Sequence, residues 1–219
     1  MATKRSSPLC ANSKGMVSMT HHFPPDKAVS PTRIDFLDAL YRNPDPKLWL
    51  EVRCIHPVSK QVKTLWMPIQ KRETILRQAD QLNREGYSVY FAPCPRLKQK
   101  GNAQSAALLP ALWVDLDCED DPTRREAALA TLKTFAPAPS ILVDSGGGWH
   151  AYWLLSQPFP LTEQLNREYA ARLLRGLFCA LGADPAYVKS VASIMRLPES
   201  VNTKPERGGA MVTVLEFAP

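Results

Sequence analysis

Residues 141–155, ILVDSGGGWHAYWLL, hold three consecutive glycines between two short apolar runs. Glycine weakens a strand interior, and it permits the left-handed backbone that tight turns need. The stretch therefore predicts a β-hairpin with strands over 139–145 and 149–155. Two glycines would suffice for a tight turn, whereas a longer run also lets backbone N–H groups approach an anion. The residues leave open whether this turn is only structural or also holds a ligand.

The elements around this hairpin predict a mixed α/β fold. A strongly apolar strand over 108–117 precedes it, followed by a helix over 121–135 that opens on an Asp-Pro start signal. A long amphipathic helix over 161–182 and a closing strand over 208–217 come after it. This order, strand–helix–strand–strand–helix–strand, is that of a split β-α-β sheet of ferredoxin-like or RNA-recognition-motif-like (RRM-like) type. The long helix repeats apolar residues every four positions, at Leu165, Tyr169, Leu173, Leu177 and Leu181.

The N-terminal half of the chain is also a mixture of helices and strands. Its predicted elements are a helix over 33–42, strands over 49–55 and 61–69, a helix over 71–86 and a strand over 87–95. A basic, polar loop over 96–104 follows, and a solvated loop is its simplest interpretation. Residues 1–30 are rich in Ser, Pro, Lys and Met without an apolar period, so we expect a flexible basic arm there.

Composition excludes some classes of protein. Five cysteines are dispersed through the 219 residues without a CxxC pair. We therefore expect a reducing cytoplasm, no disulfide framework and no structural zinc. No apolar run approaches the roughly 18 to 20 residues of a membrane span, and the N-terminus lacks the apolar core of a signal peptide. The net charge of +6 permits an anionic partner such as nucleic acid.

Asp115 and Asp117 stand two residues apart at the end of the apolar strand over 108–117. The strand period of two places both carboxylates on one face, where unpaired like charges would raise one pKa. A divalent cation removes that penalty, and carboxylate oxygens suit Mg²⁺ or Mn²⁺. An exposed strand end, where acids are common, explains the pair as well, so both interpretations stay open here.

His150 lies just inside the second strand of the hairpin, directly after the glycines. A lone histidine in a strand is more often structural than a ligand, and only the glycine run before it favours a phosphate-binding role. Asp184 follows a helix end and precedes a proline, which also suits a helix N-cap.

A proline-marked loop before the last strand carries Arg196, Asn202 and Lys204. Its cations would suit triphosphate oxygens, the arginine as a fork and the lysine as a point charge. Each of these features is ambiguous alone. Together, two strand-borne acids, a third acid, a glycine-flanked histidine and a basic loop form the set needed for two-metal nucleotidyl transfer.

The combination of WVDLD, SGGGWHAYW, an isolated aspartate and RLPESVNTK resembles the archaeo-eukaryotic primase superfamily. The likeness is greatest to the RepB-like primases and primase-polymerases carried by plasmids, phages and other mobile elements. That family has a DxD motif, a histidine within SGGGxH, a third acid and a trailing R-L-P-G-T-x-N-x-K. GYSVYFAPCPR also resembles the family's run-up to DxD. The resemblance covers roughly residues 30 to 217.

The resemblance implies a role for each matching residue. The catalytic set would be Asp115, Asp117, His150 and Asp184, of which the three aspartates would bind two Mg²⁺ or Mn²⁺ ions. The nucleotide would be held by Ser145, Gly147, Gly148, His150, Arg196, Asn202 and Lys204.

Two positions put parts of this assignment in question. The spacing from histidine to the third acid varies in the family, so Asp144 competes with Asp184, although it precedes the turn. Glu199 and Ser200 replace the family's Gly-Thr. Glu199 would add an anion near the phosphates.

The resemblance also implies an α/β (α+β) primase fold with one catalytic domain. An N-terminal α/β lobe over 31–107 would pack against an RRM-like catalytic lobe over 108–219. The active site would lie between them, and Arg96 and Lys98 of the basic loop would contact DNA.

The implied activity is DNA primase or primase-polymerase, for the replication of a plasmid, phage or mobile element. A 3′-hydroxyl would attack the α-phosphate of an NTP or dNTP on a single-stranded DNA template. No GxxxxGK[ST] motif is present, so a separate or fused helicase would separate the strands. The alternatives are a replication-initiation DNA-binding module with a degenerate nucleotidyltransferase site, and an unrelated metal-dependent nuclease.

Overall fold

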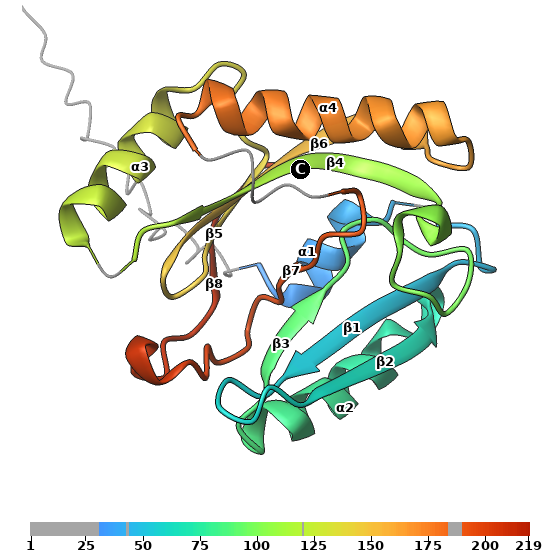
Figure 1. The fold of residues 1–219 in the computed structure, drawn as a ribbon, viewed down its shortest axis with the longest axis horizontal. Coiled ribbons are helices and arrows are strands. Elements are labelled where there is room, and N and C mark those ends of the chain that lie inside the picture. Colours follow the sequence, from blue (N-terminus) through green and yellow to red (C-terminus); the bar gives the residue numbers. More distant parts are fainter. Residues whose placement is uncertain (1–30, 43, 120, 184–189) are drawn as a thin grey trace, which may run out of the picture.

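The structure is a computed structural model that describes residues 31–42, 44–119, 121–183 and 190–219. The predicted arm over 1–30 and the candidate Asp184 lie outside the described residues. The described chain forms two four-stranded antiparallel sheets. Figure 1 shows the two sheets facing each other, with helices on their outer sides and one helix between them.

The first sheet has the strand order β2-β1-β3-β7. Its strands are β1 (Trp49–Ile55), β2 (Val62–Pro68), β3 (Ser88–Phe91) and the short β7 (Met195–Arg196). Helix α2 (Arg72–Arg84) packs against β1, β2 and β3 on the outer face and buries Ile75, Leu76 and Ala79. The predicted hairpin of β1 and β2 is confirmed, with β1 at the expected bounds.

The second sheet has the order β4-β6-β5-β8. Its strands are β4 (Leu108–Asp117), β5 (Ile141–Asp144), β6 (Gly148–Pro160) and β8 (Thr213–Phe217). Helices α3 (Pro122–Thr134) and α4 (Gln164–Ala180) cover its outer face (Figure 1). Asp121 caps α3 as predicted, because its carboxylate accepts the N–H groups of Thr123 and Arg124.

The second sheet contains the predicted split β-α-β unit, but its last strand lies at a different edge from that of a ferredoxin-like sheet. β4 and β5 run parallel, with the antiparallel β6 between them. Ferredoxin-like sheets place their last strand beside their first, whereas β8 pairs with β5 at the opposite edge. The element order fixes the antiparallel hairpin, but two edges are open to a last strand and only tertiary packing selects one. The α/β fold class is confirmed.

Helix α1 (Arg33–Leu40) lies between the two sheets (Figure 1). Its Phe36 ring meets Phe91 of β3 with ring centroids 5.4 Å apart and Tyr152 of β6 at 5.3 Å, both edge to face. Tyr152 is the register partner of Trp113 on β4. The face of β4 that carries Trp113 therefore turns inward, toward the first sheet, and Asp115 follows on that face two residues later.

The chain returns to the first sheet after α4. Met195 pairs with Phe91, and Arg196 pairs with Tyr90. Strands β1, β2 and β3 precede residue 107 and β7 follows it, so the C-terminal part of the chain contributes one strand to the first sheet. Because β7 pairs with β3, the RLPESVNTK segment, which begins at Arg196, lies between the two sheets.

Helix α4 does not bury all the residues of its four-residue repeat. The buried residues are Ala170, Leu174 and Phe178, while Leu165 is 74% exposed and Tyr169 47%. The helix packs against one sheet only. Its buried residues are each one position after a residue of the four-residue repeat. None of the described helices is both long and apolar enough to cross a membrane.

Candidate active site

Asp115 and Asp117 leave β4 on its inner face, where the strand ends. Their side chains are 50% and 51% exposed, so both carboxylates are half open to solvent. They face a cavity of about 120 Å³ between the two sheets. The cavity is lined by Tyr90, Asp115, Asp117, Ser145, Gly147, Ile194, Arg196, Asn202, Lys204 and Arg207. We call it the acid cavity, and it gathers most of the residues that the sequence singled out.

His150 stands directly opposite Asp115 in the β4–β6 register. Its Nε2 lies 3.4 Å from Asp115 Oδ1, and its side chain is only 2% exposed. Within the described residues, His150 Nδ1 has no hydrogen-bond partner. The imidazole is therefore not part of the cavity lining. It lies behind Asp115 and contacts its carboxylate from there.

The electrostatic surroundings keep Asp115 ionised. Enclosure by the protein would raise the pKa of its carboxyl, but the nearby His150, Arg196 and Lys204 outweigh that effect and hold the pKa below its ordinary value. Burial in turn lowers the pKa of the Arg196 guanidinium, against the opposing influence of Tyr90 and Asp115. The cavity therefore presents anions on one side and cations on the other.

Each of the three glycines in the hairpin turn has its own steric reason. Gly146 has a φ of +79°, in the left-handed region. A Cβ on Gly148 would lie 2.0 Å from the carbonyl oxygen of Leu116, so the close approach of β4 and β6 requires glycine there. The three atoms nearest to a Cβ on Gly147 would all belong to the Arg207 side chain, with Cζ at 2.6 Å. The turn is thus structural, and Ser145 and Gly147 also line the acid cavity.

The RLPESVNTK segment is tied to this turn by Asn202. The buried Asn202 amide donates to the carbonyl of Ser145 at 3.0 Å, and its Oδ1 accepts the backbone N–H of Lys204 at 3.3 Å. Asn202 therefore positions the loop, and the two cations of the motif reach the cavity. The Arg196 guanidinium lies over the Tyr90 ring, 4.8 Å from its centroid.

Glu199, the departure from the family pattern, points away from the acid cavity. Its Oε1 accepts the backbone N–H of Arg33 at 3.0 Å, and its Oε2 lies 3.6 Å from Arg33 Nε. Its φ of +58° is left-handed, which explains why the family pattern has glycine at this position. The expected anion near the phosphates is therefore absent from the cavity lining that the described residues form.

Asp144 is separated from Asp115 and Asp117 by the sheet itself. It pairs in register with Trp149, which is the partner of Leu116 on the outer face of β4. Its carboxylate binds the Arg125 guanidinium and accepts the N–H of Gly146 at 2.8 Å. Asp144 is thus engaged on the outer face of the sheet, which removes it as a competitor for the third acid.

Ala183 is the last described residue before Asp184, the candidate third acid. Ala183, with Leu181 and Gly182, lines a second cavity of about 420 Å³ together with Asp115 and Asp117. The three residues before position 184 therefore share a cavity lining with the acid pair. Among the described residues, no group of three or more His, Cys, Asp or Glu side chains is placed to hold a metal ion.

Three residues of the cavity lining, Tyr90, Ile194 and Arg207, escaped the sequence reasoning. Arg207 Nη2 lies 3.3 Å from Asp117 Oδ1, and its side chain is only 6% exposed. It follows the RLPESVNTK motif, and only its charge could have drawn attention to it. Tyr90 stands in the GYSVYFAPCPR run, whose alternation predicts a strand but not which side faces a site.

The structure does not place Arg96 where DNA could reach it. Arg96 and Glu51 are both fully buried, and Arg96 Nε lies 2.8 Å from Glu51 Oε2. The guanidinium also donates to the carbonyls of Val191 and Ala192, at 3.4 and 3.1 Å. A guanidinium so enclosed has no face left for a nucleic acid, whereas Lys98 is exposed.

Comparisons with known proteins identify the fold. No protein-family model and no curated protein sequence matches the chain. Among solved structures, the archaeo-eukaryotic primase (AEP) domain of the primase-polymerase of cyanophage S-2L superposes with a TM-score of 0.61 at 20% identity, over 85% of this chain and 89% of that one. The catalytic domain of primase RepB′, solved in complex with initiator DNA, gives 0.59 at 16% identity, over 86% of each chain. A longer RepB′ primase chain gives 0.58 at 17% identity, over 83% of this chain and 56% of that one. The chain therefore has the fold of AEP primase domains.

Proposed function

We propose that this protein is a primase or primase-polymerase, which transfers nucleotides from NTPs or dNTPs onto a strand directed by single-stranded DNA. One observation carries the proposal: the acid cavity sets the carboxylates of Asp115 and Asp117 against the cations Arg196, Lys204 and Arg207. The shared fold with a phage primase-polymerase and with RepB′ supports it, and suggests a role in replicating a plasmid, phage or mobile element.

The acid pair suits divalent metal ions. Asp115 and Asp117 present two half-exposed carboxylates from one face of a strand end, and such oxygens are the ligands that Mg²⁺ and Mn²⁺ prefer. Asp184 is our candidate for the third ligand, because Ala183 lines a cavity that the pair also lines. Such ions would lower the pKa of the attacking 3′-hydroxyl and neutralise charge on the leaving pyrophosphate.

The chain's own side chains would bind and orient the triphosphate. Arg196 is fixed by its β7 backbone pairing and by the Tyr90 ring, so its fork is oriented before a nucleotide arrives. Lys204 adds a point charge, and Asn202 fixes the backbone that carries it. His150 would act through Asp115, whose carboxylate it holds from behind. These groups supply position and charge, the main protein contributions to phosphoryl transfer.

The binding-module alternative is not favoured. Its support in the sequence was Glu199, as an anion placed to weaken the phosphate site. Glu199 instead binds Arg33, away from the acid cavity. The carboxylates and the basic loop meet at one cavity, as nucleotidyl transfer requires.

The test is a synthesis assay with matched charge variants. The protein is incubated with single-stranded DNA, Mg²⁺ or Mn²⁺ and labelled NTPs or dNTPs, with and without a primer. We expect labelled product from wild type and none from Asp115→Asn/Asp117→Asn. The control Glu73→Gln/Glu126→Gln removes two exposed helical carboxylates that form no ion pair within the described residues, and it should match wild type.

The same assay separates the alternatives. DNA binding by wild type without any product would favour a replication-initiation module. Shortening of the DNA without added nucleotides would indicate a nuclease. Equal synthesis by wild type and the Asp115→Asn/Asp117→Asn variant would contradict the proposed site.

A further inference from the structure

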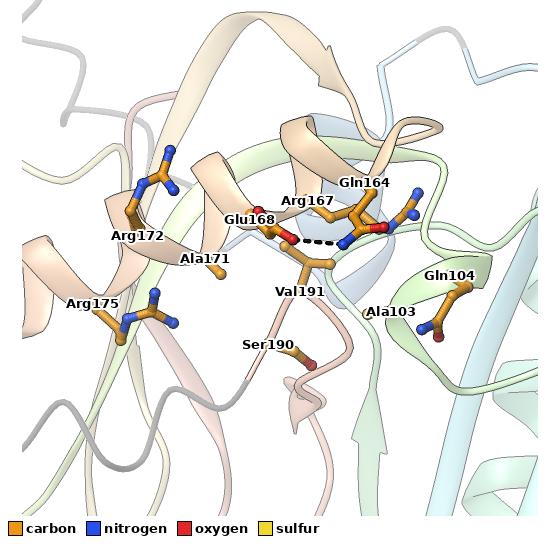
Figure 2. A pocket seen from close by; sticks show the side chains of 10 residues that line it. All are labelled: Ala103, Gln104, Gln164, Arg167, Glu168, Ala171, Arg172, Arg175, Ser190 and Val191. Atoms are coloured by element: carbon orange, nitrogen blue, oxygen red, sulfur yellow. Dashed lines mark hydrogen bonds between the residues drawn. The ribbon is translucent and has the colours of Figure 1, made fainter.

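A cavity of about 590 Å³ lies beside α4, apart from the acid cavity. Figure 2 shows its lining, which includes three arginine side chains from α4 and Gln104 of the short 3₁₀ helix η2 (Ala103–Ser105) before β4. The arginines are Arg167, Arg172 and Arg175. We call this cavity the arginine groove.

The arginines of this groove are not neutralised by carboxylates. Within the residues that the structure describes, none of the three forms an ion pair, whereas arginines such as Arg33 and Arg125 do. Arg167 donates to the carbonyls of Leu161 and Thr162, at 2.8 and 2.7 Å, so part of its role is structural.

Arg172 and Arg175 make no hydrogen bond to a described residue. Among the described residues of the lining, Glu168 supplies the one carboxylate, and it accepts a hydrogen bond from Gln164 Nε2 at 2.8 Å, as Figure 2 shows. Within the part of the chain that the structure describes, the groove therefore carries positive charge without a matching carboxylate partner, and Arg172 and Arg175 can bind an anion.

One segment of chain connects this groove to the acid cavity. Ser190 and Val191 line the arginine groove, while Ile194 and Arg196 line the acid cavity. Val191 and Ile194 are three residues apart, so at most about 10 Å of extended chain separates the two sites. A molecule long enough to occupy both would pass along this segment.

We propose that the arginine groove binds the phosphates of a single-stranded DNA strand that extends from the acid cavity, an inference that rests on the proposed function. From Arg167 to Arg175 the positive charge is spread over about 12 Å of helix rather than converging on one point. That spread suits the repeated phosphates of a strand better than one small anion.

The surface next to the groove suits the bases of such a strand. Tyr169 is 47% exposed, and the Arg172 guanidinium lies 5.9 Å from its ring centroid. Basic side chains beside an exposed aromatic ring are the usual combination for binding single strands without sequence preference. Tyr169 would supply a stacking face while Arg172 and Arg175 contact the backbone.

The experiment measures DNA affinity against salt, using the full chain. A fluorescent oligodeoxythymidine of about 16 nucleotides is titrated with protein at several salt concentrations, and binding is followed by fluorescence anisotropy. For Arg172→Ala/Arg175→Ala we expect affinity about tenfold weaker at low salt, and a salt-dependence slope reduced by about 1.4. Circular dichroism confirms that each variant is folded.

The matched control removes two arginines from the opposite side of the molecule. Arg77 and Arg84 are exposed on α2, outside the first sheet, and form no ion pair within the described part of the chain (Figure 1). Arg77→Ala/Arg84→Ala should bind DNA almost as wild type does. Equal weakening by both pairs would overturn the proposal, because it would show that only net charge matters. Unchanged affinity and slope in Arg172→Ala/Arg175→Ala would also overturn it.

These outcomes are distinguishable from a failure of the proposed function, because the binding measurement requires no synthesis. If wild type makes no product and Arg172→Ala/Arg175→Ala weakens DNA binding, the proposed polymerase function is refuted and the proposed DNA site in the groove is supported. A wild type that makes product while the variant binds DNA normally would do the reverse. If the variant loses affinity for a nucleoside triphosphate but not for DNA, the groove is a nucleotide site and the proposal is wrong.

Discussion

Two clusters of charged side chains, one in each sheet, differ in how completely their charges are compensated. In the first sheet, Glu51 and Arg96 are fully buried and bind each other, and Glu51 also binds Arg53. In the second, Asp115 and Asp117 are half exposed, with partners on one side and an open cavity on the other. The first cluster is closed, and the second keeps room for a ligand.

The difference separates structural charge from functional charge. The Glu51–Arg96 pair joins β1 to the segment after β3, and its carbonyl contacts also hold Val191 and Ala192. Removing one partner would leave a buried charge without compensation, which is costly. The carboxylates at the acid cavity still reach solvent, so their removal should cost activity rather than stability.

The largest expected effect tests the open cluster. Asp115→Asn should lower nucleotide incorporation at least about 1,000-fold, or about 4 kcal/mol in the activation barrier, because the amide keeps the shape but loses the charge. Its free energy of unfolding in urea should change by less than about 1 kcal/mol. A large loss of stability would place Asp115 with the closed cluster and remove the distinction.

The closed cluster should respond in the opposite way. Arg96→Met should lower the free energy of unfolding by about 3–5 kcal/mol, because it leaves the Glu51 carboxylate buried without its main partner. The exposed Arg77→Met serves as control and should stay within about 0.5 kcal/mol of wild type. Adding Glu51→Gln to Arg96→Met should recover part of the loss. No recovery would mean that packing, and not charge, holds this cluster together.

In the glycine turn, Gly148 packs against the backbone of β4 while Gly147 lines the acid cavity. Substituting each by alanine tests whether only the packed glycine is needed for stability. Gly148→Ala should lower the free energy of unfolding by about 1–3 kcal/mol, because its Cβ would overlap the Leu116 carbonyl. Gly147→Ala should cost about 0.5 kcal/mol or less, since the Arg207 side chain can move aside. Thermal unfolding of both variants measures the difference. Equal losses would show that the turn is sensitive to any side chain.

The last comparison concerns Glu199, which binds Arg33 and belongs to the framework. Glu199→Gly and Glu199→Ala both remove the Arg33 contacts, but only alanine keeps a Cβ at a φ of +58°. The glycine variant should therefore be more stable than the alanine variant by about 1 kcal/mol. Both should keep wild-type incorporation rates. A lower rate in the glycine variant would assign Glu199 to the cavity after all.

Much of the local structure could be predicted from the sequence. The Asp-Pro start of α3, the strand WLEVRCI and the hairpin around the glycines are set by neighbouring residues, and all three are confirmed. The acid pair was predicted to share one face, and both side chains line the same cavity. These features depend on turn chemistry, capping and the strand period, which act over a few residues.

Three other expectations needed contacts distant in the chain. Arg96 stands beside a polar loop, and only Glu51, 45 residues earlier, explains its burial. The exposed Leu165 and Tyr169 depend on which side of α4 meets β4. The edge chosen by β8 depends on packing against β5 rather than on the order of elements.

The sequence by itself therefore determined most of the elements, the hairpin and the identity of most residues at the acid cavity. Tertiary structure decided which of those residues share a surface: it moved Asp144 to the outer face, enclosed Arg96, placed His150 behind Asp115 and added Arg207. The physical reason is that periodicity and capping are local, whereas the compensation of a charge depends on partners from other strands and on access to solvent. Those partners come together only when β7 crosses to the first sheet.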